Sequence, residues 1–357
     1  MQWTTITAQQ FVDGVDTSKL FGSKDPWESF YEKKFYFSYS SLSKLMYCPE
    51  VFHKEYILGM KEELEKTYLT EGKLIHSLLL EPDKFEEQYT IMTGKIPSEN
   101  TKSVIDRVYV HHQELKATGE HKGDDLKDYS NAILDVLLDM NLHQSLKTDE
   151  QRLAKICTPD SLIYWKFMLD SFGKTVVDFV MYEKCKRIVD KIKEDSHISK
   201  LLCLNAGSEW WSTVEVFNEV AVSTELKQFP FGLKGMLDNV VVDPINKIIR
   251  ISDVKTTSKT LKDFPDSVIS YRYNLQAAIY NLLVRNKYED LVKEGYVIEF
   301  YFVVIDKNEQ FYPFMVSEET MKTWTLDLRK TLEKAEYHYT NRSYTLPYEF
   351  IKETFIL

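Results

Sequence analysis

The first half of the chain repeats its apolar residues mainly at helical spacing. Residues 38–58 place their apolar side chains on one face of a helix, and Gly59 is suited to end it. A second helix is expected at about 70–80, where an acidic residue and a proline follow. The stretch 96–206 is predicted to be mostly helical, although it is polar and weakly patterned.

The second half of the chain changes to extended patterns. Residues 209–223 alternate and are rich in β-branched and aromatic types, which predicts a pair of strands. This half therefore indicates an α/β arrangement in which helices and strands alternate. Its further predicted elements are strands at 235–242, 247–255, 296–305 and 310–315, and helices at about 271–284 and 318–339.

The strongest chemical signal lies on two strands that a turn at 243–246 joins. Asp253 and Lys255 are two residues apart on one strand, so their side chains point to the same face. Asp238 lies on the neighbouring strand, where it can approach Asp253. Two carboxylates at this spacing form an oxygen-rich site for Mg²⁺ or Mn²⁺. A lysine beside them can orient or deprotonate a water while the metal polarises a phosphodiester.

A simpler interpretation is an exposed hairpin whose acids and lysine pair on the surface, because Asp-x-Lys alone is a weak motif. The aliphatic residues around the cluster favour the metal site instead. They place the charges at the end of a buried sheet, where unpaired charge is costly without a ligand. These flanking residues are Val240, Val241, Val242, Ile248, Ile249 and Ile251.

The hairpin at 234–257 (KGMLDNVVVDPINKIIRISDVKTT) resembles the active-site hairpin of PD-(D/E)XK nucleases, specifically the RecB/RecE-type branch. Residues 72–76 (GKLIH) look like the Gly-x-x-x-His helix of that branch. Residues 273–280 (YNLQAAIY) are similar to its Gln-x-x-x-Tyr helix, and residues 38–49 to its entry helix. Four motifs in the right order make the resemblance specific.

The resemblance implies a role for each matched residue. His76 is implied as a metal ligand, and without Asp238 and Asp253 it would be an ordinary packed or solvated histidine. Gln276 and Tyr280 share one helix face and are implied to support the site, although such a pair is usually unremarkable. The implied catalytic residues are Asp238, Asp253, Lys255, Gln276 and Tyr280, and the implied metal ligands are His76, Asp238, Asp253 and Val254.

Candidate contacts to nucleic acid lie beside these motifs. Tyr271 and Arg272 begin the predicted helix at about 271–284 and could meet phosphate, helped by the helix dipole. Thr256 and Thr257 directly follow Lys255 and are further candidates. For an extra acidic ligand, Glu215 and Glu225 are candidates, and spacing does not choose between them.

Charge and hydropathy bear on how the protein binds nucleic acid and where in the cell it is expected. The net charge of -10 argues against broad non-specific coating of nucleic acid, although a local basic groove would suffice to hold phosphates. No apolar run reaches the roughly 18 residues that a bilayer requires. The N-terminus lacks the regions of a signal peptide. We therefore expect a cytoplasmic protein without membrane contact.

The four cysteines, Cys48, Cys157, Cys185 and Cys203, form no Cys-x-x-Cys pair, and we expect them to be buried thiols. Some relatives of the RecB/RecE type hold an iron–sulfur cluster with one cysteine near the entry helix and three near the C-terminus. Cys48 fits the first position, but no cysteine follows Cys203. We therefore expect no iron–sulfur cluster.

The resemblance covers about 38–90 and 209–316, with a long unmatched segment between. It implies a PD-(D/E)XK (restriction-endonuclease-like) core in which a mixed β-sheet is flanked by helices. The expected division is an N-terminal extension at 1–37, a nuclease core at 38–95 and 207–357, and a helical insertion at 96–206.

The expected function is that of an exonuclease, which uses Mg²⁺ or Mn²⁺ to hydrolyse DNA from duplex ends in recombination, repair or phage DNA metabolism. Its candidate partners are DNA, further copies of itself and a single-strand annealing or recombination protein. Two alternatives stay open: an endonuclease of the same superfamily in defence or repair, and a non-catalytic nucleic-acid-binding or assembly protein. The intact set of motif residues argues against the non-catalytic alternative.

Overall fold

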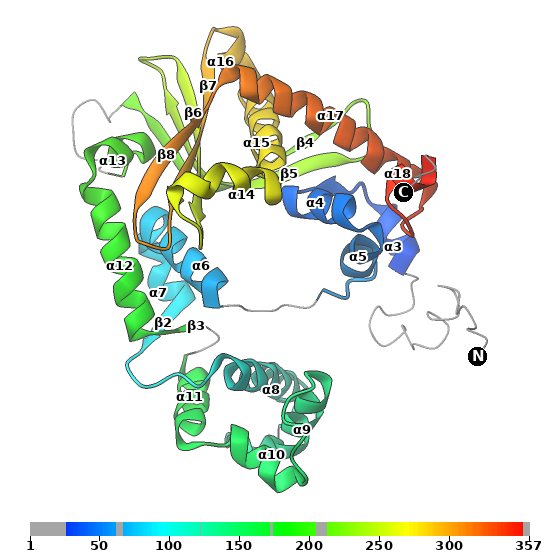
Figure 1. Ribbon diagram of the computed structural model, residues 1–357, viewed down its shortest axis with the longest axis vertical. Coiled ribbons are helices and arrows are strands. Elements are labelled where there is room, and N and C mark those ends of the chain that lie inside the picture. The colour runs from blue at the N-terminus through cyan, green and yellow to red at the C-terminus, as the bar shows by residue number, and fades with distance from the viewer. Residues whose placement is uncertain (1–25, 62–66, 122, 172–173, 205–212, 353–357) are drawn as a thin grey trace.

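A mixed β-sheet with helices on both faces forms the centre of the molecule (Figure 1). The computed structural model describes residues 26–61, 67–121, 123–171, 174–204 and 213–352. The predicted α/β fold, a mixed sheet flanked by helices, is confirmed. The sheet contains six strands: β1 (Tyr36–Phe37), β4 (Glu215–Glu225), β5 (Gly232–Asp243), β6 (Ile248–Thr256), β7 (Val297–Ile305) and β8 (Phe311–Val316).

The connections explain the order of the strands, which is β1-β5-β6-β7-β8 with β4 also paired to β5. A tight turn joins the antiparallel β5 and β6, and the Asp243 side chain accepts hydrogen bonds from the backbone of Ile245 and Asn246 there. In contrast, β6 and β7 are parallel, so the chain must cross over between them. Three helices, α14 to α16, form this crossover and cover one face of the sheet.

The face that α15 covers carries the largest apolar core. Alternate residues of β6 and β7 point into it, including Ile249, Ile251, Phe300 and Phe302. The crossover helices and helices from both ends of the chain form this side. They are α3 (Pro26–Glu32), α4 (Tyr39–Tyr47), α5 (Pro49–Phe52), α14 (Phe264–Ser270), α15 (Tyr273–Lys287), α16 (Glu289–Lys293), α17 (Glu318–Asn341) and α18 (Tyr348–Lys352).

A second core lies on the opposite face of the sheet. Leu74 and Ile75 pack there together with Val254 of β6 and Val303 of β7. Because side chains alternate along a strand, Asp253 points to the other face, toward α15. The helices of this side are α6 (Thr67–Leu80), α7 (Phe85–Gln88), α12 (Phe179–Glu194) and α13 (Ser196–Leu202).

A third, fully helical unit lies below the sheet in Figure 1. It has a core of its own, which includes Ile133, Tyr164 and Trp165. Two short parallel strands, β2 (Tyr89–Met92) and β3 (Thr175–Asp178), lead into and out of it. Its helices are α8 (Glu99–Thr118), α9 (Ser130–Asp139), α10 (Asp149–Ile156) and α11 (Pro159–Asp170).

This packing bears on the predicted insertion at 96–206. Helices α8 to α11 form the separate unit, whereas α12 and α13 pack on the sheet. In the predicted extension at 1–37, α3 and β1 likewise join the main core, and residues 1–25 lie outside the described part. The division into domains stays a prediction, and the packing favours a narrower insertion between β2 and β3.

Two predicted elements differ from the structure. The helix at 38–58 is interrupted at Cys48, whose extended backbone is favoured by the proline that follows, before α5 and a π-helical turn (His53–Ile57) continue. The strand pair predicted at 209–223 is wrong in its described part. Residues 215–223 belong to the single strand β4, whose partner is β5, and residues 209–212 lie outside the described part.

The prediction that the four cysteines are buried is confirmed for two of them. Cys185 and Cys203 are buried, whereas Cys48 and Cys157 are partly exposed, and all four are free thiols. Cys48 is partly exposed because it occupies the break between α4 and α5. Among the helices of the described ranges, none combines the length and the apolar character needed to cross a membrane.

Candidate active site

The candidate site lies where β5 and β6 separate. The two strands pair from Asp243 opposite Ile248 to Asn239 opposite Ser252. Beyond this last pair β6 continues beside β7, and β5 continues beside β4. Asp238 and Asp253 are the first residues past the pairing, so they flank the opening.

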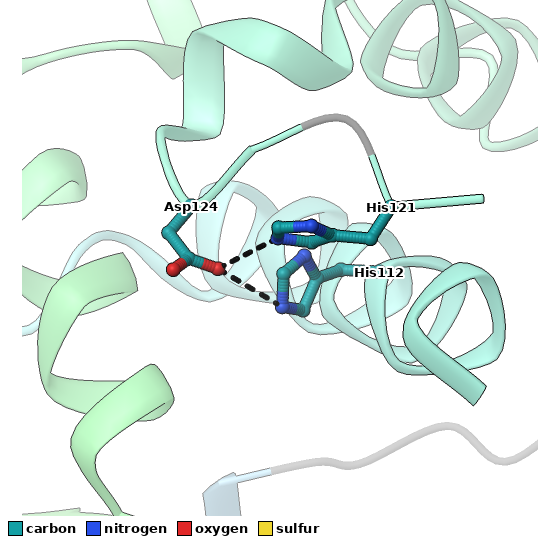
Figure 2. Close-up of side chains that lie close together, drawn as sticks. All are labelled: His112, His121 and Asp124. Atoms are coloured by element: carbon teal, nitrogen blue, oxygen red, sulfur yellow. Dashed lines mark hydrogen bonds and ion pairs between the residues drawn. The ribbon is translucent and has the colours of Figure 1, made fainter. Parts of the chain in front are cut away.

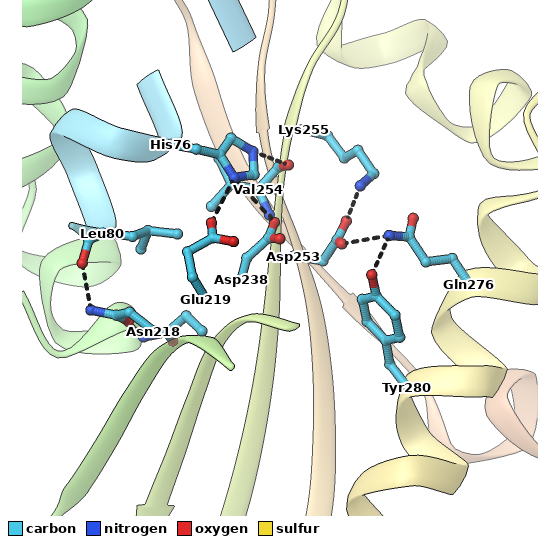
Figure 3. Close-up of polar contacts among 11 residues, drawn as sticks. His76, Leu80, Asn218, Glu219, Asp238, Asp253, Val254, Lys255, Gln276 and Tyr280 are labelled. Atoms are coloured by element: carbon cyan, nitrogen blue, oxygen red, sulfur yellow. Dashed lines mark hydrogen bonds and ion pairs between the residues drawn. The ribbon is translucent and has the colours of Figure 1, made fainter. Parts of the chain in front are cut away.

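Asp238 is fixed at this opening by the backbone of the other strand. The amide of Val254 donates a hydrogen bond of 2.7 Å to Asp238 Oδ2. In a continued β5–β6 ladder this amide would donate to a backbone carbonyl of β5. The Asp238 carboxylate accepts its hydrogen bond instead. The contact holds Asp238 toward β6 and toward the helix α6 (Figure 3).

His76 reaches the opening from α6. Its Nε2 lies 3.0 Å from the carbonyl oxygen of Val254, and its Nδ1 lies 3.7 Å from Asp238 Oδ2. The helix approaches β6 closely because Gly72 has no side chain. A Cβ at this position would lie 3.1 Å from Thr256 Oγ1. Gly72 thus allows α6 to approach β6, and His76 of the same segment then reaches Val254 and Asp238.

Glu219 is a site residue that the sequence analysis missed. Its Oε1 lies 3.3 Å from His76 Nδ1. In β4, Asn218 pairs with Asn239 and Val220 with Leu237, so Glu219 stands opposite Asp238. Its φ of 47° is left-handed, a conformation that costs a non-glycine residue about 1–3 kcal/mol and that gathers at functional sites.

The two acids proposed from spacing lie elsewhere. Glu215 pairs with Val242, near the far end of β5. At the other end of β4, Glu225 forms an ion pair of 3.1 Å with Lys34. The sequence did not reveal which glutamate of β4 lies opposite Asp238. That depends on the register of β4 on β5, and the connection at residues 226–231 is too long to determine it. Neither Glu215 nor Glu225 is therefore a ligand candidate.

Asp253 is held on the α15 side of the opening. Lys255 Nζ lies 2.5 Å from its Oδ2, and Gln276 Nε2 donates a hydrogen bond of 3.0 Å to its Oδ1. The same Gln276 amide donates to the Tyr280 hydroxyl at 3.0 Å (Figure 3). Lys255 also lies over the ring of Tyr273, with 5.1 Å between Nζ and the centroid. The Gln-x-x-x-Tyr segment therefore orients the acid of the Asp-x-Lys motif.

Burial and the neighbouring charges together determine the pKa values of these groups. Desolvation raises the pKa of Asp253 to about 6, although Lys255 opposes the shift. Burial alone would lower the pKa of His76, but Asp238 and Glu219 outweigh it and raise the pKa to about 9. Lys255 behaves similarly: Asp253 and Asp238 overcome desolvation and raise its pKa. Without a metal, protonated His76 and Lys255 therefore balance the negative charge of the acids.

The donor set fits a divalent cation. One ligand atom each of His76, Glu219 and Asp238 can be chosen within 4.8 Å of the others. The carbonyl oxygen of Val254 faces the same group, and the Asp253 carboxylate lies across the opening. Carboxylate and carbonyl oxygens suit Mg²⁺, and an added imidazole suits Mn²⁺ at least as well. A cation here would take over the charge balance that protonated His76 provides.

A family comparison agrees with this geometry. A model of the PD-(D/E)XK nuclease superfamily matches residues 184–345, which contain Asp238, Asp253, Lys255, Gln276 and Tyr280. This region belongs to the PD-(D/E)XK nuclease superfamily. The helix α6 with His76 precedes the matched residues.

Other comparisons add little to this PD-(D/E)XK assignment. A solved structure from Eubacterium rectale, described provisionally as an exonuclease, is similar over 88% of this chain and 85% of its own. Its sequence identity is 15% and its TM-score 0.44. No curated protein matches the chain.

The candidate site opens into a cleft of about 1300 Å³. Thr256, Thr257 and Tyr271, three of the residues predicted to contact nucleic acid, line this cleft. Arg272 does not. It occupies a left-handed turn before α15 and lines a separate groove between α14 and α17, because α14 turns the chain just before this point. The sequence analysis missed three lysines of the cleft, Lys73, Lys184 and Lys307.

Proposed function

We propose that this chain is a divalent-metal-dependent DNA exonuclease of the RecB/RecE type, which hydrolyses phosphodiester bonds from duplex ends. The observation that carries the proposal is the meeting of five residues at one site: His76, Lys255 and Gln276 line the cleft, and the buried acids Asp238 and Asp253 lie beside them (Figure 3). These residues come from four elements, α6, β5, β6 and α15, and each belongs to one of the sequence motifs that resemble that branch. Packing alone gives no reason to gather so many buried charges.

The residues divide into metal-holding and positioning groups. His76, Asp238, Asp253 and Val254, through its carbonyl oxygen, would hold Mg²⁺ or Mn²⁺, and Glu219 would complete the set. When bound, the ion supplies Lewis-acid polarisation of the scissile phosphate. Only Cys48 occupies a cluster position, so we propose that no iron–sulfur cluster is present.

Lys255 orients the attacking water and offsets charge that develops on the phosphate. Its raised pKa keeps it an ammonium at neutral pH, which favours these roles over removal of a proton. Gln276 fixes the Asp253 carboxylate, and Tyr280 fixes Gln276. The buried Gln276 Oε1 has no hydrogen-bond partner in the described part of the chain, so it can accept one from the water.

Three points support DNA ends as the substrate. The combination of Gly-x-x-x-His, Asp-x-Lys and Gln-x-x-x-Tyr resembles end-resecting enzymes. The net charge of -10 disfavours tight gripping of any random duplex, whereas the lysines of the cleft can guide one strand. An enzyme that encloses its DNA strand stays bound because the strand cannot leave sideways. We therefore also propose a homo-oligomer that works in the cytoplasm, in recombination, repair or phage DNA metabolism, with an annealing or recombination partner.

The chemistry is tested with purified protein, end-labelled duplex, and Mg²⁺, Mn²⁺ or EDTA. Cleavage should require the metal and disappear in Asp253→Asn, while Lys255→Ala should lower kcat by several orders of magnitude with the fold intact. Glu225→Gln, on the same sheet but far from the site, is the matched control. Full activity of Asp253→Asn would end the proposal.

The requirement for an end is tested separately. Linear duplex and covalently closed circles of the same sequence are digested side by side at one metal concentration. Rapid loss of the linear form with intact circles is the expected result. Cutting of both forms at comparable rates would identify an endonuclease instead.

A further inference from the structure

A second group of metal-ligating side chains lies in the helical unit, outside the residues that line the nuclease cleft. It consists of His112 in α8 and of His121 and Asp124 in the loop that follows α8 (Figure 2). The same oxygen, Asp124 Oδ1, lies 3.0 Å from His121 Nε2 and 3.8 Å from His112 Nε2. One ligand atom from each residue can be chosen so that all lie within 4.8 Å of one another.

The hydrogen bonds around His112 determine which ring nitrogen carries the proton. The Tyr129 hydroxyl donates to the carbonyl oxygen of Gly123 at 2.8 Å. Its proton is thus committed, so at 2.7 Å the Tyr129 oxygen accepts a hydrogen bond from His112 Nδ1. In a neutral imidazole, Nε2 then carries a lone pair. This lone pair faces the Asp124 carboxylate (Figure 2).

In this arrangement, His112 Nε2 has no hydrogen-bond partner among the described residues. His112 is fully buried, and its Nε2 makes no hydrogen bond to any described residue. The distance of 3.8 Å to Asp124 Oδ1 is too long for a hydrogen bond. Buried polar atoms are almost always paired, so an orphaned nitrogen that faces a carboxylate calls for an explanation. A cation between the two atoms supplies one, since both offer it electron pairs.

The spacing of the ligand atoms suits such an ion. A tetrahedral zinc site with bonds of about 2.0–2.1 Å separates its ligand atoms by about 3.3 Å. The two distances to Asp124 Oδ1, 3.0 and 3.8 Å, lie on either side of that value. Metal-bound histidines also typically donate their second ring N–H to a fixed acceptor, as His112 does to Tyr129. His121 and Asp124 are exposed, which leaves room for water as a fourth ligand.

We propose that His112, His121 and Asp124 form a second metal site, which takes Zn²⁺ or a similar late transition-metal ion. The ion would tie the loop after α8 to that helix and so stabilise the helical unit. The loop backbone is already braced, because Trp165 Nε1 donates to the Asp124 carbonyl at 2.8 Å. Two imidazoles and one carboxylate are a donor set that favours Zn²⁺ over Mg²⁺.

The test uses the full chain carrying Asp238→Asn and Asp253→Asn, which remove carboxylate ligands from the nuclease site. After dialysis against chelator, this protein is titrated with Zn²⁺ and, separately, with Co²⁺. We expect one tight equivalent of Zn²⁺, a rise in the thermal unfolding temperature, and the strong visible absorption of four-coordinate Co²⁺. On the same background, His121→Gln and Asp124→Asn should each weaken Zn²⁺ binding by at least roughly tenfold.

Two further variants separate metal binding from folding. Tyr129→Phe changes no ligand but releases His112 Nδ1, and it should weaken binding by roughly 10–100-fold. His111→Gln, next to His112 but outside the cluster, should bind Zn²⁺ as the background protein does. Circular dichroism of each metal-free protein checks that it is folded. The proposal is overturned if the background protein takes up no Zn²⁺, or if folded His121→Gln and Asp124→Asn retain its affinity.

Discussion

Asp253 is completely buried, and its charge is tolerated because two neighbours share its oxygens. Lys255 contacts one oxygen and Gln276 the other, so the carboxylate keeps one orientation. Removing either partner would leave a buried charge only partly compensated, which is among the most costly changes in a protein interior. The same contacts that stabilise the fold at this point therefore also aim the acid into the opening between β5 and β6.

Glu219 gives the first prediction at this scale. Glu219→Gln should weaken Mn²⁺ binding and lower cleavage by roughly 10–100-fold at limiting metal, because an amide is a poorer cation ligand. The loss should shrink at saturating Mn²⁺ if the residue acts through the metal. Cleavage is measured over a series of Mn²⁺ concentrations, with Glu215→Gln on the same strand as control. Equal activity of the two variants at every concentration would remove Glu219 from the ligand set.

Gly235 gives the second prediction. A Cβ at this position would lie 2.7 Å from Tyr280 Cε1, so Gly235→Ala must displace the ring that fixes Gln276. We expect a loss of about 1–3 kcal/mol in the free energy of unfolding, together with slower cleavage. Urea denaturation measures the first and single-turnover digestion the second. In Gly235→Ala/Tyr280→Leu the clash is relieved, so strictly additive stability losses would contradict this explanation.

The residues of the site differed in how far sequence could predict them. Asp253 and Lys255 share a face because strands alternate, and a tight turn brings Asp238 to the neighbouring strand. Glu219 required the register of β4, which a longer connection leaves open. Arg272 was placed wrongly because its direction depends on α14, a helix that the sequence analysis did not predict.

At the scale of elements, the helix α12 shows why the sequence pattern alone does not decide where the helical insertion ends. Its apolar stripe, with Cys185, Ile188, Val189 and Ile192, predicts a helix but not the surface that it covers. In the structure this stripe packs with α6 beneath the sheet. By contrast, β5, β6 and the helix α17 were predictable, since each is long and strongly patterned.

An ionic contact beside this helix gives the third prediction. Arg187 and Lys191 of α12 lie 2.8 and 3.2 Å from the carboxylate of Glu309, in the turn between β7 and β8. The hydrogen bond from Arg187, supported by the one from Lys191 and by the charges of both residues, lowers the pKa of Glu309 from its ordinary value of 4.5 to about 2. Glu309→Gln should lower the free energy of unfolding by at most about 1 kcal/mol at neutral pH, because the contact is partly exposed.

The sign of the pH dependence follows from the lowered pKa. The contribution of Glu309 is complete above pH 4.5 and is lost as the pH falls toward 2, where the folded state also takes up the proton. Denaturation of the protein and of Glu309→Gln from pH 7 to pH 3.5 measures the difference. Glu318→Gln, in an exposed pair with Lys322, serves as control. A difference that grows toward acid would refute the assignment.

At the scale of the whole molecule, three apolar cores stabilise different parts of the structure. Two of them lie on the two faces of the sheet and position the cleft, and the third is formed mainly by α8–α11. Met92 and Val176 enter the third core from the short strands β2 and β3, whereas Tyr89 and Val177 of the same strands enter the second. The helical unit is therefore attached to the rest through this strand pair, and its removal need not uncover the sheet.

The last prediction tests this separation by replacing residues 97–171 with a Gly/Ser linker. Because β2 and β3 are parallel and in register from Tyr89 opposite Thr175 to Met92 opposite Asp178, the linker must run back along one strand. That path is about 10 Å long at 3.3 Å per residue, plus about 4.8 Å between the strands. A linker of about eight residues has a mean reach of about 16 Å, which suffices.

The shortened protein needs Met92→Thr and Val176→Thr, since both side chains would otherwise lose their apolar cover. We expect it to fold, to bind Mn²⁺ at the nuclease site and to cleave short single strands. If the helical unit guides the duplex or joins subunits, duplex binding or the oligomer will be lost while Mn²⁺ binding stays. Calorimetry, gel-shift assays and light scattering measure the three properties in parallel. Failure to fold, with the sheet exposed to proteolysis, would show instead that α8–α11 are part of the nuclease core.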